Sequence, residues 1–264
     1  MNQPYKIADA ARSWPAMKWN LEMLRTKCKN STTTLYSYKK NDNEEPITEK
    51  MQINEALKYI NKYSIATTQD ISYCIKQVNI NNFENLMQDL QRIELFKEKI
   101  VEINLWIGNK RASTPWHYDL LDNAIIQIEG NKRILFGKPE LTKLFKPQIR
   151  RTINQHENKD FNFSTLSNQE VNQEMLKQSR SFEKIELKKG DIAIIPSYWW
   201  HQVECKSEVS ITANYFYNSQ HNKKAERISE EIRSLDEIYN ILKSSSIERR
   251  IAIQEILKTM FVNI

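Results

Sequence analysis

The chain is poor in the residues that bend or cross-link a backbone. Its 264 residues include four glycines, seven prolines and three cysteines. So little glycine and proline argues against an architecture rich in linkers. Cys28, Cys74 and Cys205 are far apart and form no C-x-x-C pair, so neither a disulfide framework nor a structural zinc site is expected. This usage fits a reducing compartment, and we expect a cytoplasmic protein, or a nuclear one in a eukaryote.

Long apolar runs are missing as well. No run of about 18 apolar residues occurs, so we expect no membrane-spanning helix. The start of the chain lacks the apolar segment of a secretory signal. A hydrophobic content of 40% with 10% aromatic residues suits one substantial globular domain with an appendage.

Histidine is scarce too, with four in the chain, and the setting of two of them is informative. His117-Tyr118-Asp119 is followed much later by His201, and both lie at the margins of apolar, strand-like segments. Two imidazoles and one carboxylate can occupy one face of an octahedral Fe(II) and leave three positions open. The triplet alone is weak evidence, because short motifs recur by chance. His156 and His221 lie in polar stretches and are interpreted as solvated.

The strand-like segments around these residues predict a mainly β core. Apolar or alternating runs occupy residues 103–107, 124–128, 134–136, 192–195 and 210–217. Gly130-Asn131 separates the second run from the third, which predicts a hairpin. The first hundred residues favour helices instead, with apolar residues at helical spacing in 19–28, 49–63 and 83–100. A polar insert over 154–181 could serve as a lid or substrate-binding arm.

Two further helices are predicted at the end of the chain, over 225–242 and from a capping pattern at residues 245–248 onward. The net charge is +6, and the excess is concentrated between Lys132 and Arg151. One interpretation is a solvated basic loop. The other is a docking patch for an acidic protein segment or a nucleic acid.

At Thr114-Pro115-Trp116-His117-Tyr118-Asp119 and at Trp199-Trp200-His201, the chain resembles the JmjC or cupin-like family of Fe(II)- and 2-oxoglutarate-dependent oxygenases. It is similar in style to the small hydroxylase branch, which includes the asparaginyl hydroxylase of hypoxia-inducible factor and the tRNA wybutosine hydroxylase. The resemblance implies a double-stranded β-helix, or jelly roll, over 100–218. A helical part of the domain over 1–99 would precede it, and helices over 219–264 would follow and form a homodimer.

The resemblance also assigns roles by position. His117, Asp119 and His201 match the iron ligands and catalytic centre. Lys132 matches the lysine that pairs with the distal carboxylate of 2-oxoglutarate, and three residues match polar groups around the same co-substrate: Thr114, Asn123 and Asn214. One departure concerns a tyrosine that hydrogen-bonds the co-substrate, because the best register places Cys74 there and Tyr73 one step away. Such a shift on a strand turns a side chain to the other face.

These expectations together describe an enzyme that uses Fe(II), 2-oxoglutarate and O2 to hydroxylate a macromolecule, most readily a protein side chain. A tRNA-base hydroxylase is an alternative within the class, and lysine demethylation is less favoured. From a different class, a catalytically silent cupin-like binding protein or a metal-dependent cupin isomerase also fits a jelly roll. Metal content and dependence on 2-oxoglutarate separate these alternatives.

Overall fold

The computed structural model describes residues 3–28, 31–39, 46–65, 71–91, 93, 100–150, 160–164, 166–177, 182–217 and 245–261. The chain divides into two compact units, Met1–Ser219 and Gln220–Ile264. No helix within these ranges is both long and apolar enough to cross a membrane.

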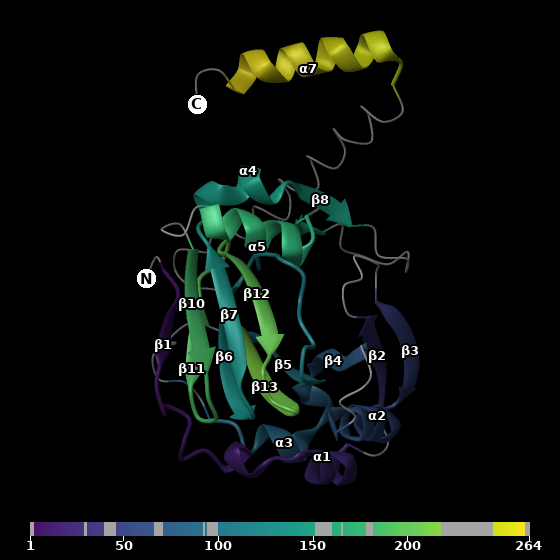
Figure 1. Ribbon diagram of the computed structural model, residues 1–264, viewed down its shortest axis with the longest axis vertical. Helices are drawn as coiled ribbons and strands as arrows, with labels where there is room; N and C mark the ends of the chain where they lie inside the picture. Colours follow the sequence, from purple (N-terminus) through teal and green to yellow (C-terminus); the bar gives the residue numbers. More distant parts are fainter. Residues whose placement is uncertain are drawn as a thin grey trace. The chain divides into compact units, whose positions relative to one another are not determined.

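Strands dominate the first unit (Figure 1). In chain order they are β1 (Tyr5–Ile7), β2 (Thr32–Lys39), β3 (Ile47–Gln52), β4 (Ile71–Asn79), β5 (Ile100–Asn109), β6 (Asp122–Glu129), β7 (Lys132–Gly137), β8 (Pro147–Arg150), β9 (Asp160–Ser164), β10 (Phe182–Leu187), β11 (Ile192–Ile195), β12 (Trp200–Cys205) and β13 (Val209–Tyr217). The helices are α1 (Leu21–Lys27), α2 (Ile53–Ile65), α3 (Glu84–Met87), α4 (Thr142–Phe145) and α5 (Asn168–Lys177), with short 3-10 turns at Pro15–Lys18, Ile80–Asn82 and Pro139–Leu141.

Two antiparallel sheets build the jelly roll that the sequence predicts. The larger has the order β1-β11-β6-β13-β5-β4-β2-β3, and the smaller has the order β10-β7-β12. Ile125 of the larger sheet packs with Ile134 and Phe136 of the smaller one, so the two sheets share an apolar cluster. On its other face the larger sheet carries the main core, where strand residues pack against helices that include α2. The larger sheet therefore has an outer face toward the helices and an inner face toward the smaller sheet.

The hairpin predicted at Gly130-Asn131 is wrong. Strand β6 pairs with β11 and β13 in the larger sheet, whereas β7 pairs with β10 and β12 in the smaller one. The turn is real, and Gly130 takes a φ of 72°, which favours glycine. It carries the chain from one sheet to the other. A turn signal marks a reversal but does not say which strands pair.

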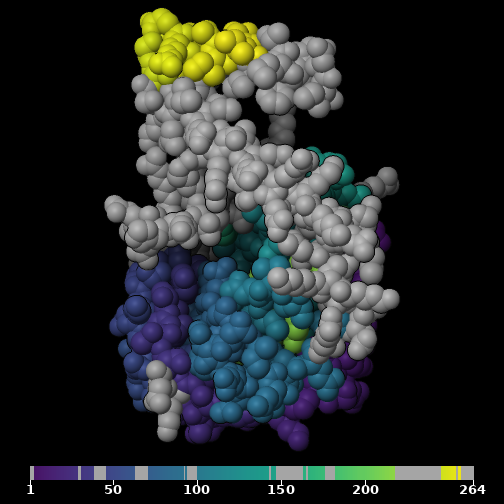
Figure 2. All heavy atoms as spheres, turned by 180° about the vertical axis from the view of Figure 1, so that it is seen from behind, coloured from purple at the N-terminus to yellow at the C-terminus, as the bar shows by residue number. Residues whose placement is uncertain are grey.

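The expectation of a helical part over 1–99 also needs correction. Residues in this range supply β1 to β4, and the last three of these extend the larger sheet beyond β5. Seen from behind, purple to blue N-terminal residues form much of the surface of the body (Figure 2). The predicted helix over 49–63 begins as strand β3 and becomes helical only at Ile53. Of the helix predicted over 83–100, the described residues 83–91, 93 and 100 are helical only at α3. Strand pairing here overrides local helical periodicity.

The described residues of the polar insert include a strand and a helix, since β9 pairs with β8 and α5 follows. Residues 151–159, 165 and 178–181 of this region lie outside the described residues. In the second unit, α7 (Ile247–Phe261) confirms the last predicted helix, and the Ser246 hydroxyl accepts from the Arg249 amide at its start, 3.4 Å away. The predicted helix over 225–242 lies outside the described residues.

Candidate metal centre

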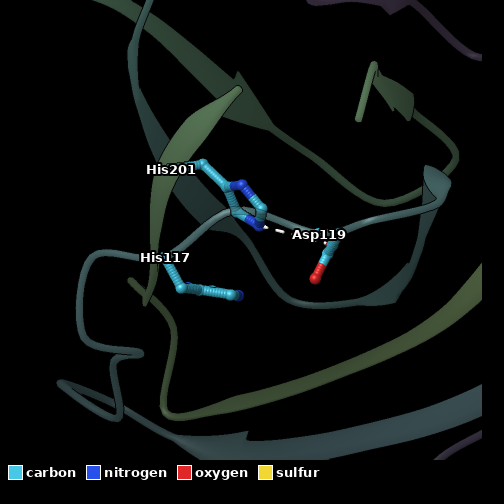
Figure 3. A group of neighbouring side chains, drawn as sticks. All are labelled: His117, Asp119 and His201. Carbon is cyan, nitrogen blue, oxygen red and sulfur yellow. Dashed lines mark ion pairs between the residues drawn. The ribbon is translucent and has the colours of Figure 1, made fainter. Parts of the chain in front are cut away.

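Three side chains that could hold a metal lie close together, although the third is far from the others in the sequence: His117, Asp119 and His201 (Figure 3). The first two follow β5, and His201 is the second residue of β12. The His117 amide donates to the His201 carbonyl at 3.0 Å, and the His201 amide donates back to the His117 carbonyl at 2.7 Å. One ligand atom from each of the three side chains lies within 4.8 Å of the others. A backbone bridge therefore fixes the spacing of the two imidazoles.

The tautomer of each histidine is set by a carbonyl two residues earlier. His117 Nδ1 lies 2.8 Å from the Pro115 carbonyl oxygen, and His201 Nδ1 lies 2.9 Å from that of Trp199. Because a carbonyl can only accept, each Nδ1 carries the proton and donates it. Each Nε2 then keeps its lone pair, which is the form that binds a metal.

Burial keeps the His117 imidazole uncharged. The side chains of His117 and His201 are almost fully enclosed, and their ring centroids are 4.2 Å apart. Burial is the largest cause that lowers the pKa of His117, and the neighbouring His201 imidazole also lowers it, by more than Asp119 raises it; the resulting pKa is about 4. His117 is therefore neutral near pH 7, as metal ligation requires.

Asp119 is held from two sides. The Asn123 amide donates to its Oδ2 at 3.2 Å, and the Tyr198 backbone amide donates to its carbonyl at 2.9 Å. Tyr198 has a φ of 64°, an unusual conformation for a tyrosine. In addition, Asp122 accepts from the Ser197 amide at 2.7 Å. The turn before His201 is thus tied to the segment that carries Asp119.

Aromatic rings close one side of the centre. Phe163 of β9 stacks on His117, with ring centroids 5.4 Å apart and planes 15° apart. Trp116 and Trp200 are fully buried beside Phe145. The insert therefore reaches the metal centre through Phe163, a contact that the sequence did not reveal.

Lys132 is a buried cation at the start of β7, on the side of the smaller sheet that faces the larger one. The residue is only 5% exposed, and its Nζ donates a hydrogen bond to Thr212 Oγ1 at 2.8 Å. Burial lowers the pKa of Lys132, while the Cys205 and Cys74 thiols nearby act in the opposite direction. No ion pair joins Lys132 to a carboxylate within the described parts of the chain. A buried ammonium without a counterion is costly, so this position suits an anionic ligand.

Amide side chains continue from the metal centre across the inner face. Asn123 on β6 is opposite Phe216 on β13, and Asn214 two residues earlier on β13 is opposite Asn104 on β5. The carbonyl oxygens of all three amides are buried and have no hydrogen-bond partner in the structure. Buried polar groups normally have partners. These unpaired acceptors are typical of a ligand-binding site.

Thr114 is another residue that the resemblance matches to a co-substrate contact. Thr114 is 8% exposed and its hydroxyl accepts from the Val203 amide at 2.9 Å, so its own proton can be donated elsewhere.

Of the two candidates for the family tyrosine, Tyr73 packs with the outer core, whereas Cys74 lies with Cys205 and Ala112 on the inner side. Of the two, Cys74 has its side chain on the inner side, and it offers no hydroxyl.

The basic residues between Lys132 and Arg151 do not form one uniform surface patch. Lys132 is interior and does not belong to a surface patch, and Arg133 is paired with Glu186 and Glu204. Lys138 and Lys146 are exposed. The side chains of Lys143 and Arg150 lie outside the described part of the structure, as do Arg151, His156 and His221.

Sequence reasoning missed Asn104, Thr212 and Phe163. The reasoning that drew attention to Asn214, a buried amide in an apolar strand needing partners, applies equally to Asn104. Thr212 carries no signal of its own, because its role depends on the crossing of β13 and β7.

The donor set fits a ferrous ion. Two imidazole nitrogens and one carboxylate, with a tautomer fixed for ligation, form the two-histidine, one-carboxylate face used by non-haem Fe(II) oxygenases. The uncompensated Lys132 and the unpaired amides fit a carboxylate-bearing co-substrate beside it.

Comparison with known proteins agrees with this class of site. Residues 1–223 match the family described as the cupin-like domain, and the chain belongs to that family. Among its relatives are the lysine-specific demethylase JMJ31 of Arabidopsis thaliana and lysine-specific demethylase 8 of Danio rerio. The first is 28% identical over 52% of this chain and 24% of the relative, and the second is 24% identical over 82% and 53%. JmjC domain-containing protein D of Dictyostelium discoideum is 34% identical over 42% of this chain and 24% of the relative. The chain spans a quarter to about half the length of these relatives.

Proposed function

We propose that this chain is an Fe(II)- and 2-oxoglutarate-dependent oxygenase that hydroxylates a side chain of a protein substrate. The observation that carries the proposal is the histidine–aspartate centre together with a buried, uncompensated Lys132 on β7, the strand that pairs with the strand of His201. A metal centre alone would serve many chemistries. A cation buried beside it calls for a carboxylate-bearing co-substrate.

In this proposal His117, Asp119 and His201 hold the iron. Lys132 and Thr114 bind the distal carboxylate of 2-oxoglutarate, and Asn123 and Asn214 line the pocket. With O2, the loaded centre supplies the oxidising power that inserts oxygen into a substrate C–H bond, while 2-oxoglutarate is converted to succinate and carbon dioxide.

The chain's own residues orient and shield this chemistry. The carbonyls of Pro115 and Trp199 hold the imidazoles in the ligating tautomer, and Asn123 orients the Asp119 carboxylate. Phe163, together with the buried tryptophans Trp116 and Trp200, keeps water from one side of the centre. Such enclosure favours electrostatic interactions with the bound groups.

Lysine demethylation is the second candidate, because two relatives carry that name. Oxidation of an N-methyl carbon is the same C–H chemistry. The distinction lies in the product, since loss of formaldehyde marks demethylation and a stable mass gain marks hydroxylation. A screen of unmodified and methylated peptides, with tRNA as a further arm, separates these outcomes.

The first experiment is an anaerobic titration with Fe(II) and then 2-oxoglutarate, followed by visible absorbance. We expect the charge-transfer band of a chelated 2-oxo acid, and we expect Asp119→Ala to abolish it. Circular dichroism of the variant checks that the fold is kept. Folded wild-type protein without a band would overturn the oxygenase proposal and favour the cupin-like binding protein.

We further propose that the chain forms a homodimer through α7, whose Ile247, Ile251 and Ile256 are more than half exposed. Sedimentation equilibrium of the full chain is expected to give a dimer mass. Replacing Ile251 with Asp should shift the mass toward monomer. A monomer mass at all concentrations would refute this part of the proposal.

A further inference from the structure

The inner face of the larger sheet contains a row of acceptor groups on β5, beyond the residues assigned to metal and co-substrate. Alternation along this strand separates two sets of side chains. Ile103, Leu105 and Ile107 belong to the outer core. The intervening residues Glu102, Asn104 and Trp106 therefore point to the inner face.

Strand register fixes where this row lies relative to the metal centre. Asn104 is directly opposite Asn214, and Glu102 is opposite Phe216, whose other neighbour is Asn123. Trp106 is opposite Thr212, which binds Lys132. Because neighbouring strands are about 4.8 Å apart, Asn104 lies about one strand beyond Asn214 and about two beyond the strand of Asn123. The row is next to the proposed centre and is not part of it.

Among the described residues, the row has a single side-chain hydrogen bond and no ion pair. Asn104 is 2% exposed, and its carbonyl oxygen has no hydrogen-bond partner. Glu102 accepts one bond, from the Asn79 amide at 3.3 Å, and no described Lys or Arg forms an ion pair with it. The nearby Lys76 is engaged with the rings of Tyr36 and Tyr38, 4.6 and 4.8 Å from their centroids. A buried acceptor and an uncompensated carboxylate on one face call for a ligand with N–H donors and positive charge.

We infer that Glu102 and Asn104 form the subsite for a basic side chain of the substrate, an ammonium or a guanidinium, beside the metal centre. The indole N–H of Trp106 is also buried without a partner, and a backbone carbonyl of a bound peptide would satisfy it. This inference rests on the proposed function and names the substrate class of that site. It assigns opposite charges to the two sides of the inner face, with Lys132 for the co-substrate and Glu102 for the substrate.

The test is a titration of the full chain, loaded with Zn(II) in place of iron and with 2-oxoglutarate, followed by NMR of the asparagine carboxamides. The Asn104 signal is assigned from its absence in Asn104→Leu. The probes are N-acetyl methylamides of arginine and lysine, with those of norleucine, glutamine and glutamate as controls. We expect arginine, lysine or both to shift the Asn104 signal, and the controls to leave it in place.

Two variants sharpen the test. Glu102→Gln keeps the shape of the side chain and removes its charge. It should weaken binding of the basic probe at least tenfold. Asn109→Leu is the matched control for Asn104→Leu. Asn109 is on the same strand and equally buried, but its oxygen accepts from the Tyr73 amide at 2.8 Å. Asn104→Leu should keep or raise the unfolding temperature, and Asn109→Leu should lower it.

The outcomes separate the two proposals. Shifts of Asn104 with neutral or acidic probes equal to those with basic ones, or no shift with any probe while 2-oxoglutarate binds, would overturn the subsite. In the second case water alone satisfies the amide. Failure of 2-oxoglutarate to perturb any signal would overturn the proposed function instead, and the titration repeated without it would still decide the subsite.

Discussion

The two faces of the larger sheet are built on opposite principles. On the outer face Ile103, Leu105 and Ile107 pack into a continuous apolar core with the helices. On the inner face, one residue away along the same strand, the Asn104 carbonyl oxygen and the Trp106 indole N–H are buried without hydrogen-bond partners. The outer face stabilises the fold. The inner face lowers stability and keeps binding groups ready for ligands, as functional sites commonly do.

The strongest test of the outer face is Leu105→Ala. Leu105 is fully buried, so the truncation leaves a cavity and should lower the free energy of unfolding by about 2–5 kcal/mol. Urea denaturation measures the change. A loss below about 1 kcal/mol would mean that this face does not carry the core.

The corresponding test of the inner face is Lys132→Met. Removing a buried charge that pairs with a ligand should weaken 2-oxoglutarate binding on the order of 30-fold or more. The free energy of unfolding should stay the same or rise, because a desolvated cation is lost. Calorimetric titration and urea denaturation of the same variant give both numbers. Unchanged affinity for 2-oxoglutarate would remove Lys132 from the site.

A smaller contrast lies within a single residue type. Asn109→Leu should cost about 1–3 kcal/mol because the Tyr73 amide is left unpaired. Asn104→Leu should cost nothing, since its oxygen has no partner to lose. Equal losses in both variants, measured by thermal and urea unfolding, would show that Asn104 is a structural residue.

The prediction with the smallest effect at neutral pH concerns the affinity for 2-oxoglutarate, which should change only in alkaline solution. Burial lowers the pKa of Lys132, so the ammonium loses its proton at a lower pH than an exposed lysine does. Affinity for 2-oxoglutarate should be constant below this pKa and fall as pH rises through it, because the neutral amine cannot pair with a carboxylate. Dissociation constants measured across the alkaline range test this. Lys132→Arg should remove the decline, since a guanidinium stays charged.

The metal triad could be predicted from the sequence because each ligand lies next to a strand with a clear apolar pattern. The same patterns predicted β5, β11 and β13 correctly. They failed at Gly130, where the turn joins two sheets, and at residues 1–99, where β2 to β4 extend the larger sheet. Both failures concern pairing between distant segments. Local periodicity says which face of a strand is apolar, but not which strand lies beside it.

The sequence by itself determined the chemistry of the donor set, because only His117, Asp119 and His201 combine the right atoms with rigid strand margins. Only the tertiary structure decided which residues surround that set. It buried Lys132, placed the Cys74 side chain and not that of Tyr73 on the inner side, and put Asn104 beside Asn214. The physical reason is that side-chain type is local, whereas burial and hydrogen-bond satisfaction depend on how distant strands pair and pack.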